Sequence, residues 1–214
     1  MSSTTEGTAV ELQVPVLYPT QPAAVRLMNT IWADRAAVHD SLESVAHLQA
    51  WAEEAGLGRH QGLGEHDLAR ARALRDALRR LAAEVTGDSR PHSVSEGLSS
   101  EAALAVLNEF VSHCAPVLRH GPQGGYVREW LTDGSGLQRE LNLIALDGSE
   151  VLTRQAPHEL KACGGPGCVL YFVRDHPRRE WCSAGCGNRA RVARHYRRSR
   201  SSDEGPATGR GADH

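Results

Sequence analysis

Lysine is almost absent from this chain of 214 residues, because Lys161 is the only one and nearly every basic residue is arginine. Aromatic residues are also few, at 5%. No apolar run approaches the roughly 20 residues that cross a bilayer, and the N-terminal stretch "MSSTTEGTAVELQ" lacks the basic start and apolar segment of a secretory signal. We therefore expect a cytoplasmic protein with no membrane partner.

The length fits one domain, or one domain with a small module, and Leu, Val and Ala are plentiful enough for a core. The net charge of −2 hides an uneven distribution. Residues 1–160 contain 13 Arg against 21 Asp and Glu, whereas the rest of the chain contains 11 basic residues against 5 acidic ones. This asymmetry predicts an acidic body that carries a basic, anion-seeking end.

Four divisions of the chain follow from its patterning. We expect an extended or partly disordered segment over residues 1–20, a mainly helical domain with some β structure over 21–156, a small module over 157–200, and a disordered polar tail over 201–214. The predicted fold class is therefore mainly α (α+β).

The spacing of apolar residues predicts four helices in the body. The first starts near Pro22 and continues through Trp32, and the second follows a capping box of Asp40 and Glu43 and ends at Gly56. The third spans residues 66–86, and the fourth follows a Ser99 or Ser100 cap and points Leu104, Leu107 and Val111 inward.

The pattern after the fourth helix is weaker. Residues 125–141 suggest a hairpin that turns around residues 133–136, and residues 141–152 suggest another helix that Gly148 weakens. Cys114 stands apart, as a buried free thiol. The histidines of the body are scattered without the spacing of a metal site, so we expect no catalytic residues there and assign the chain no enzymatic activity.

Four cysteines form the pattern C-x4-C-x13-C-x3-C; they are Cys163, Cys168, Cys182 and Cys186. A Gly- and Pro-rich turn, "GGPG", brings the first two thiols together. Disulfides are disfavoured without an export signal, and a redox or nucleophilic pair would leave the other pair unexplained. The pattern favours one structural Zn²⁺, because four protein ligands leave no open position for a substrate.

The segment between the two pairs predicts a hairpin in which "VLYFV" pairs with "RREW". A helix follows from Asn188, and the dipole at its start favours the Cys186 thiolate. Knuckle, hairpin and helix together describe a treble-clef-like zinc finger with a basic C-terminal helix. At 100° per residue, one face of the helix carries Arg191, Arg194, His195 and Arg198, while Val192 and Tyr196 would pack on the hairpin.

An ordered row of cations is what phosphate binding requires, although a merely solvated basic helix is the alternative. We therefore predict nucleic-acid contacts by Arg189, Arg191, Arg194, His195, Arg197 and Arg198.

The segment "CGGPGCVLYF…RREWCSAGCGNRARVARHYRRSR" resembles the CGNR zinc finger of bacterial proteins, whose name stands here as Cys186–Arg189. The upstream segment "VRLMNTIWADRAAVHDSLESVAHLQAWAEEAGL" resembles the ABATE domain that usually precedes this finger, and Asn29-Thr30 is among the matching features. The resemblance implies a stress-induced transcription regulator with a DNA-binding finger, zinc ligands at the four cysteines, and Arg189 as the motif arginine.

Three functions remain open from the sequence. The first is a DNA-binding regulator whose helical domain senses an unidentified small-molecule effector or forms a homodimer. The second is a zinc-stabilised module that binds RNA or protein; its four aromatics would be Tyr171, Phe172, Trp181 and Tyr196. The third is a nuclease built around His176 and His195, which we regard as surface histidines.

Overall fold

The computed structural model describes residues 14–90, 97–154 and 158–203. Along the chain they form α1 (Ala23–Met28), β1 (Ile31–Ala33), β2 (Val38–Asp40), α2 (Val45–Glu54), α3 (Glu65–Thr86), α4 (Ser100–Ser112), β3 (Cys114–His120), β4 (Tyr126–Thr132), α5 (Gly136–Thr153), β5 (Leu160–Ala162), β6 (Tyr171–Val173) and α6 (Ala184–Asp203). The strands pair as three separate antiparallel hairpins, β1–β2, β3–β4 and β5–β6. The predicted class, mainly helical with a small finger at the end, is confirmed.

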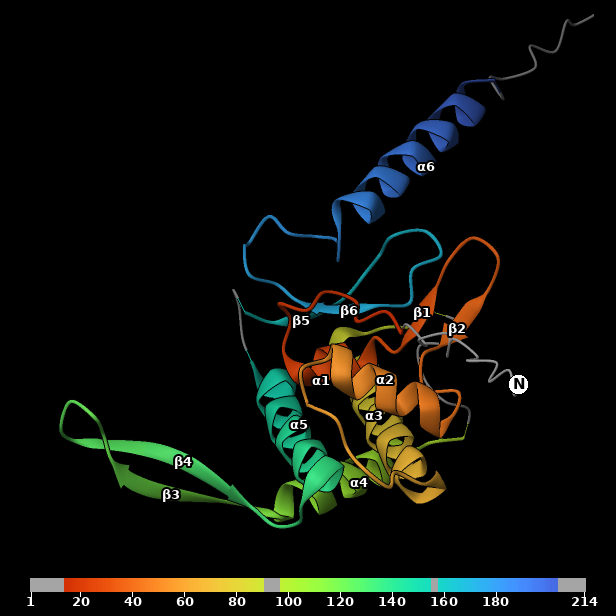
Figure 1. Cartoon of the computed structure of the whole chain (residues 1–214). Helices are drawn as coiled ribbons and strands as arrows, with labels where there is room; N and C mark the ends of the chain where they lie inside the picture. The colour runs from red at the N-terminus through yellow and green to blue at the C-terminus, as the bar shows by residue number, and fades with distance from the viewer. Residues whose placement is uncertain (1–13, 91–96, 155–157, 204–214) are drawn as a thin grey trace, which may run out of the picture.

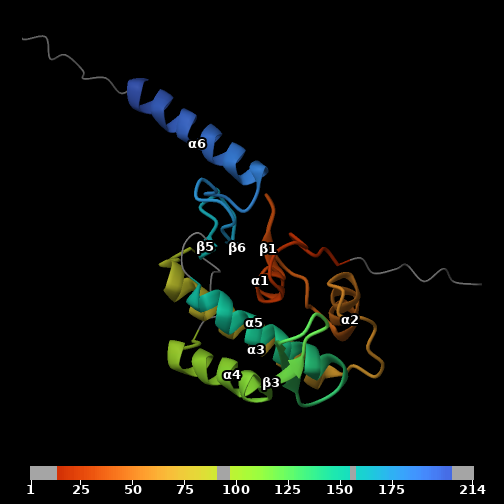
Figure 2. The same cartoon turned by 90° about the vertical axis from the view of Figure 1, so that its left-hand side faces the viewer.

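Helices α1, α3, α4 and α5 pack around one core (Figures 1 and 2). The long helix α3 is the centre of this bundle, and its predicted apolar stripe is buried. Asp67 accepts a hydrogen bond from the amide of Gly64 at the start of α3, and Gly87 ends the helix in a left-handed conformation. Truncating a core side chain such as Leu78 to Ala would cost about 2–5 kcal/mol of unfolding free energy.

Gly148 is a packing residue and does not weaken α5. A Cβ at this position would collide with Leu78 of α3 and also touch Ala24 of α1. The absent side chain therefore lets three helices approach one another closely, whereas the sequence pattern alone indicates only a residue that weakens the helix.

The first predicted helix is wrong beyond its sixth residue, because α1 ends at Met28 and the next residues turn into β1. Trp32 pairs with His39 across the β1–β2 hairpin instead of continuing a helical face. The predicted capping box of α2 is wrong as well. Ser44 is the cap and accepts a hydrogen bond from the amide of His47, while Asp40 binds Arg75 of α3.

The predicted hairpin in the middle of the chain is present, but its turn is not at residues 133–136. The hairpin β3–β4 turns at residues 121–125, and residues 133–135 connect it to α5 instead. It projects away from the bundle (Figure 1), and Leu118 and Tyr126 are 71% and 73% exposed. In α4, Ser99 is the cap, and Ala103 and Phe110 point inward while Leu104 is exposed.

Helix α6 is the outermost element of the described chain and extends away from the rest of the molecule (Figures 1 and 2). It begins four residues earlier than predicted and includes Cys186 and the first residues of the expected tail. Residues 1–13 and 204–214, which fall in the two segments predicted to be disordered, lie outside the described residues. Within the described part, none of the helices combines the length and apolar character needed to cross a membrane.

Candidate zinc centre and nucleic-acid interface

The four predicted cysteines meet in one buried cluster, and their Sγ atoms all lie within 4.8 Å of one another. The Sγ of Cys182 lies 3.8 Å from that of Cys168 and 3.4 Å from that of Cys186. Cys114 lies elsewhere, on β3, where its thiol donates to the carbonyl of Asn142. The chain therefore gathers the two pairs of thiols that the spacing predicted.

The first pair sits on a tight turn between β5 and β6, which we call the knuckle (Cys163–Cys168). The amide of Cys168 donates to the carbonyl of Gly165 at 2.9 Å, which closes the turn. A Cβ on Gly165 would stand 2.9 Å from the Cβ of Cys186. Glycine is therefore needed there for the knuckle to approach the second pair.

The second pair lies at the start of α6. Ser183 caps this helix, since its hydroxyl accepts from the amide of Cys186 at 3.2 Å. Arg179 holds the two residues before Ser183 in place, because it donates to the carbonyls of Trp181 and Cys182. Its guanidinium also lies over the ring of Phe172. The predicted partner strand "RREW" is wrong. Residues 178–181 form no strand, and β6 pairs with β5 on the other side of the knuckle.

The donor set fits Zn²⁺. A tetrahedral site with Zn–S bonds of about 2.3 Å has sulfur–sulfur edges of about 3.8 Å, and the sulfur–sulfur distances of the cluster lie around this value, from 3.4 Å to at most 4.8 Å. Hydrogen bonds with Cys168 and Cys182 lower the pKa of the Cys163 thiol. The hydrogen bond between Cys168 and Cys163 raises the pKa of the Cys168 thiol. Neighbouring thiolates without a cation thus compete for protons, and a divalent ion removes that competition. Zinc held by four cysteines is structural.

The tetrapeptide Cys186–Arg189 has a physical explanation in this cluster. Cys186 supplies a sulfur, and Gly187 leaves room for Trp181, whose Cδ1 would lie 2.8 Å from an added Cβ. The Nη2 of Arg189 donates to the Sγ of Cys186 at 3.0 Å. Arg189 therefore supports a zinc ligand with part of its guanidinium, a role that the sequence did not predict.

Polar side chains of the helical domain attach it to the finger. The Nη1 of Arg90 donates to the carbonyls of Cys163 and Cys168 at 2.7 and 2.9 Å, and Asp88 pairs with the same guanidinium at 2.6 Å. Arg79 donates to the carbonyl of Val169. The contacts of Arg79 and Arg90 with the finger could not be predicted from spacing, because the residues that they join lie more than 70 positions apart in the sequence.

The segment before α1 also contacts the cluster. Tyr18, at φ 57°, places its hydroxyl 3.5 Å from the Sγ of Cys182. Burial raises the pKa of Tyr18 to about 12, so the phenol stays protonated at neutral pH. Val14 is buried in the main core. Residues 14–20 form no helix or strand, and Leu17 and Tyr18 pack against the cysteine cluster.

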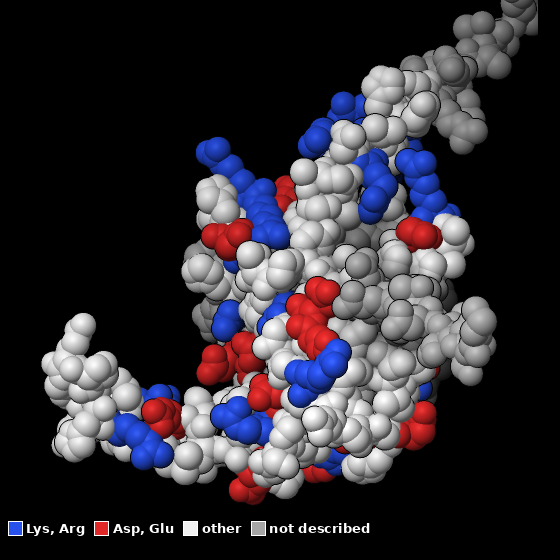
Figure 3. Space-filling view, in the orientation of Figure 1, with Lys and Arg blue, Asp and Glu red and all other residues white. Residues whose placement is uncertain are grey.

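The predicted nucleic-acid residues all lie on α6 and are exposed. They are Arg189, Arg191, Arg194, His195, Arg197 and Arg198. Figure 3 shows more Lys and Arg than Asp and Glu over the finger and the base of α6, with a few acidic side chains among them. The prediction that Val192 and Tyr196 pack on a hairpin is wrong, because they are 48% and 68% exposed. The helix projects away from the finger, and among its side chains whose burial is described, through residue 199, Ala190 is the last buried one.

Two known protein families match successive parts of the chain. A family described as "Putative stress-induced transcription regulator" (ABATE) matches residues 21–155. The CGNR zinc finger family matches residues 159–199. No curated protein matches the chain.

Proposed function

Because the chain belongs to the ABATE family of transcription regulators and ends in a CGNR zinc finger, we propose that it binds duplex DNA through α6. The observation that carries the proposal is the form of this helix. Its base is fixed by the zinc cluster, and every described side chain beyond Ala193 is exposed. An α-helix with its side chains is about 10–12 Å across, which matches the roughly 12 Å major groove.

The chemistry of α6 suits phosphate. Arg191, Arg194 and Arg198 fall within one arc with His195 when the helix is drawn at 100° per residue. Guanidinium groups bind phosphate oxygens in pairs, and each phosphate contact adds to the salt dependence of binding. The acidic bundle, with 21 Asp and Glu against 13 Arg over residues 1–160, would repel DNA, so the proposed contact is confined to the finger end.

The aromatic residues favour duplex DNA over single-stranded RNA. Single strands are usually held by exposed rings on which bases stack. Tyr171 and Phe172 are buried and Trp181 is half-buried, which leaves Tyr196 as the exposed ring of the four. Binding of RNA or an acidic protein remains the second candidate function.

We also propose that the bundle forms a homodimer, since one finger offers a small interface for specific recognition. The β3–β4 hairpin is the candidate contact with the second copy. Two-stranded hairpins are marginally stable in water by themselves, and this one exposes Leu118, Tyr126 and Leu131. Light scattering tests this point: the full chain should have twice the monomer mass, and Leu118→Ser with Tyr126→Ser should halve it. A monomeric mass with and without DNA contradicts the dimer.

Selection of bound duplexes from a random DNA library tests the proposed function. The zinc-loaded full chain should enrich one motif, and Cys182→Ser should lose the enrichment while Cys114→Ser keeps it. Competition by single-stranded RNA that removes all bound duplex would favour the second candidate. Metal-dependent nicking of supercoiled plasmid would contradict our assignment of a non-enzymatic regulator.

A further inference from the structure

A groove separates the β1–β2 loop of the bundle from the knuckle of the finger, and we call it the loop–knuckle groove. Its larger lobe has a volume of about 630 Å³ and its smaller lobe about 440 Å³. Both fall in the range of small-molecule sites, roughly 300–1,000 Å³. The two lobes lie next to each other, because five residues line both of them: Ala33, Asp34, Arg35, Pro166 and Gly167.

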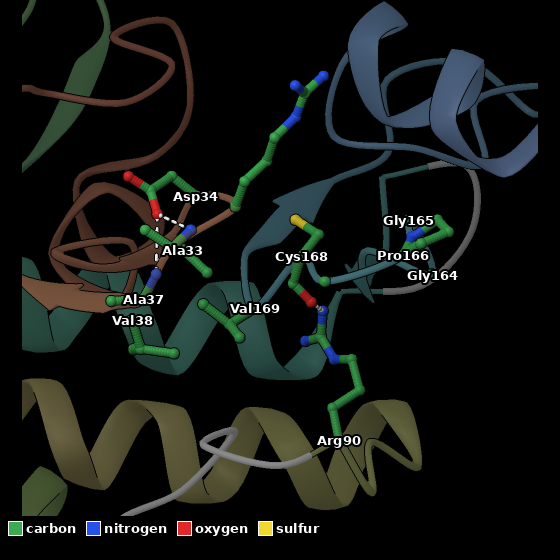
Figure 4. A pocket seen from close by; sticks show the side chains of 13 residues that line it. Ala33, Asp34, Ala37, Val38, Arg90, Gly164, Gly165, Pro166, Cys168 and Val169 are labelled. Carbon is green, nitrogen blue, oxygen red and sulfur yellow. Dashed lines mark hydrogen bonds between the residues drawn. The ribbon is translucent and has the colours of Figure 1, made fainter. Parts of the chain in front are cut away.

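The walls of the larger lobe are mostly apolar. Figure 4 shows Ala33, Ala37 and Val38 from the β1–β2 hairpin on one side, and Pro166 and Val169 from the finger on the other. Arg90 also lines this lobe, but its guanidinium is occupied by Asp88 and by the carbonyls of the knuckle. This lobe therefore suits a compact apolar group.

Two arginines from different parts of the chain line the smaller lobe. Arg35 comes from the β1–β2 loop and Arg189 from the base of α6. Arg35 is exposed and makes no hydrogen bond or ion pair within the described residues. The adjacent carboxylate of Asp34 is occupied, since it accepts from the amides of Ala36 and Ala37 and lies 3.1 Å from His39 Nε2. This lobe therefore favours an anionic group.

We propose that the loop–knuckle groove binds a small organic carboxylate, with its apolar body in the larger lobe and its carboxylate between Arg35 and Arg189. A phosphate of the DNA backbone would satisfy the cations but leave the apolar lobe unfilled. A neutral apolar molecule would leave Arg35 without a partner, whereas Arg189 already donates to Cys186. An anion with a compact apolar body fits both lobes at once.

Such a ligand would act on the finger directly. It would touch the knuckle that supplies Cys163 and Cys168, and it would share Arg189, which also donates to Cys186. A molecule that contacts both the β1–β2 loop and the knuckle stabilises the relative position of bundle and finger in which both contacts are made. The groove thus links ligand binding to the orientation of α6, and this regulatory consequence rests on the proposed function.

Calorimetric titration of the zinc-loaded full chain tests the site, with sodium benzoate, sodium hexanoate and inorganic phosphate as probes at one ionic strength. Benzoate or hexanoate should bind saturably and more tightly than phosphate. Arg35→Gln should weaken this binding about tenfold or more, because it removes a charge-assisted hydrogen bond. Ala37→Trp should block the apolar lobe, and the matched control Arg128→Gln, on the distant β3–β4 hairpin, should leave binding unchanged.

Three results would overturn the proposal. They are the absence of saturable binding by either carboxylate, equal binding by wild type and Arg35→Gln, and phosphate binding as tight as that of the carboxylates, which would indicate a DNA-phosphate contact. Arg35 is exposed, so its variant should unfold at the wild-type temperature even if Ala37→Trp does not fold. Fluorescence anisotropy of a labelled duplex separates the two claims. Carboxylate binding without duplex binding retains the groove and rejects the proposed function, and the reverse result rejects the groove alone.

Discussion

The side chain of Asn29 forms two hydrogen bonds to the backbone of Tyr171, 142 residues later in the chain. Its Nδ2 donates to the carbonyl of Tyr171 at 3.0 Å, and its Oδ1 accepts from the amide of Tyr171 at 2.9 Å. Both residues are almost fully buried, at 1% and 0% exposure. Asn29 follows α1 and Tyr171 opens β6, so this amide joins the helical bundle to the finger in the way a neighbouring strand would.

Replacing Asn29 with Ala should destabilise the protein by about 2–4 kcal/mol. The substitution leaves a buried amide and a buried carbonyl of Tyr171 without partners, and each unsatisfied group costs about 1–3 kcal/mol. Urea unfolding measures the change, with Asn108→Ala on the exposed face of α4 as the control. A loss below about 0.5 kcal/mol would show that the two hydrogen bonds do not hold the parts together.

The zinc ligands could be predicted from the sequence, whereas their supports could not. The spacing of Cys163, Cys168, Cys182 and Cys186 is local and chemically specific. The attachments by Asn29, Arg79 and Arg90 are contacts between distant segments, and no periodicity encodes them. The first helix was overextended for the same reason: Ile31 and Trp32 have helical spacing, but pairing with Asp40 and His39 determines their structure.

The basic helix could be located from the sequence but its packing could not. Val192 and Tyr196 are one turn apart and look like a buried face. The structure leaves them exposed because the finger is too small to cover α6 beyond its first two turns. The sequence pattern indicates that Gly148 weakens its helix, whereas the structure shows that the helix needs glycine there. Only the position of Leu78 shows that a Cβ would not fit.

Asp88 should make stability depend on acid pH. Burial acts to raise its pKa, but hydrogen bonds from Arg90 and Tyr171 outweigh burial and hold the pKa below its ordinary value. A lowered folded-state pKa stabilises the protein above the unfolded-state pKa, about 3.9, and this contribution is lost as the pH falls through the folded-state pKa. Asp88→Asn should therefore be less stable at pH 7 and lose less stability below about pH 4.

Chemical denaturation at several pH values measures this difference. Zinc release in acid is common to both proteins, so the difference between wild type and Asp88→Asn isolates the carboxylate. Asp133→Asn, whose side chain is exposed, should follow the wild type. Parallel curves for wild type and Asp88→Asn would exclude the role of Asp88.

Adding one methyl group at position 148 should destabilise the bundle. Alanine usually favours a helix over glycine by about 1 kcal/mol, but at this position its Cβ collides with Leu78, and overpacking costs about 1–3 kcal/mol. Thermal unfolding of Gly148→Ala should therefore show a lower midpoint than wild type. Gly185→Ala in the first turn of α6, where an added Cβ meets nothing closer than 3.7 Å, is the matched control; a stabilised Gly148→Ala would refute the close packing.

Removing zinc should unfold the finger and leave most of the bundle helical. The cysteines form a small core with Leu170 and Phe172, apart from the main core. Zinc binding in finger peptides supplies roughly 10–16 kcal/mol of apparent free energy. Elemental analysis should find one zinc per chain in wild type and Cys114→Ser and none in Cys182→Ser. A chelator should change tryptophan fluorescence, to which Trp181 beside the cluster contributes, much more than far-UV circular dichroism, and equal loss of both signals would contradict separate cores.

The salt dependence of duplex binding by the double variant Arg191→Ala, Arg194→Ala tests the central claim most directly. Each lost phosphate contact should reduce the slope of log K against log salt by about 0.9, so the zinc-loaded variant should bind more weakly with a slope lower by about 1.8. Arg119→Ala with Arg128→Ala, on the β3–β4 hairpin, should keep the wild-type slope. Unchanged affinity and slope in the α6 variant would contradict DNA binding by this helix.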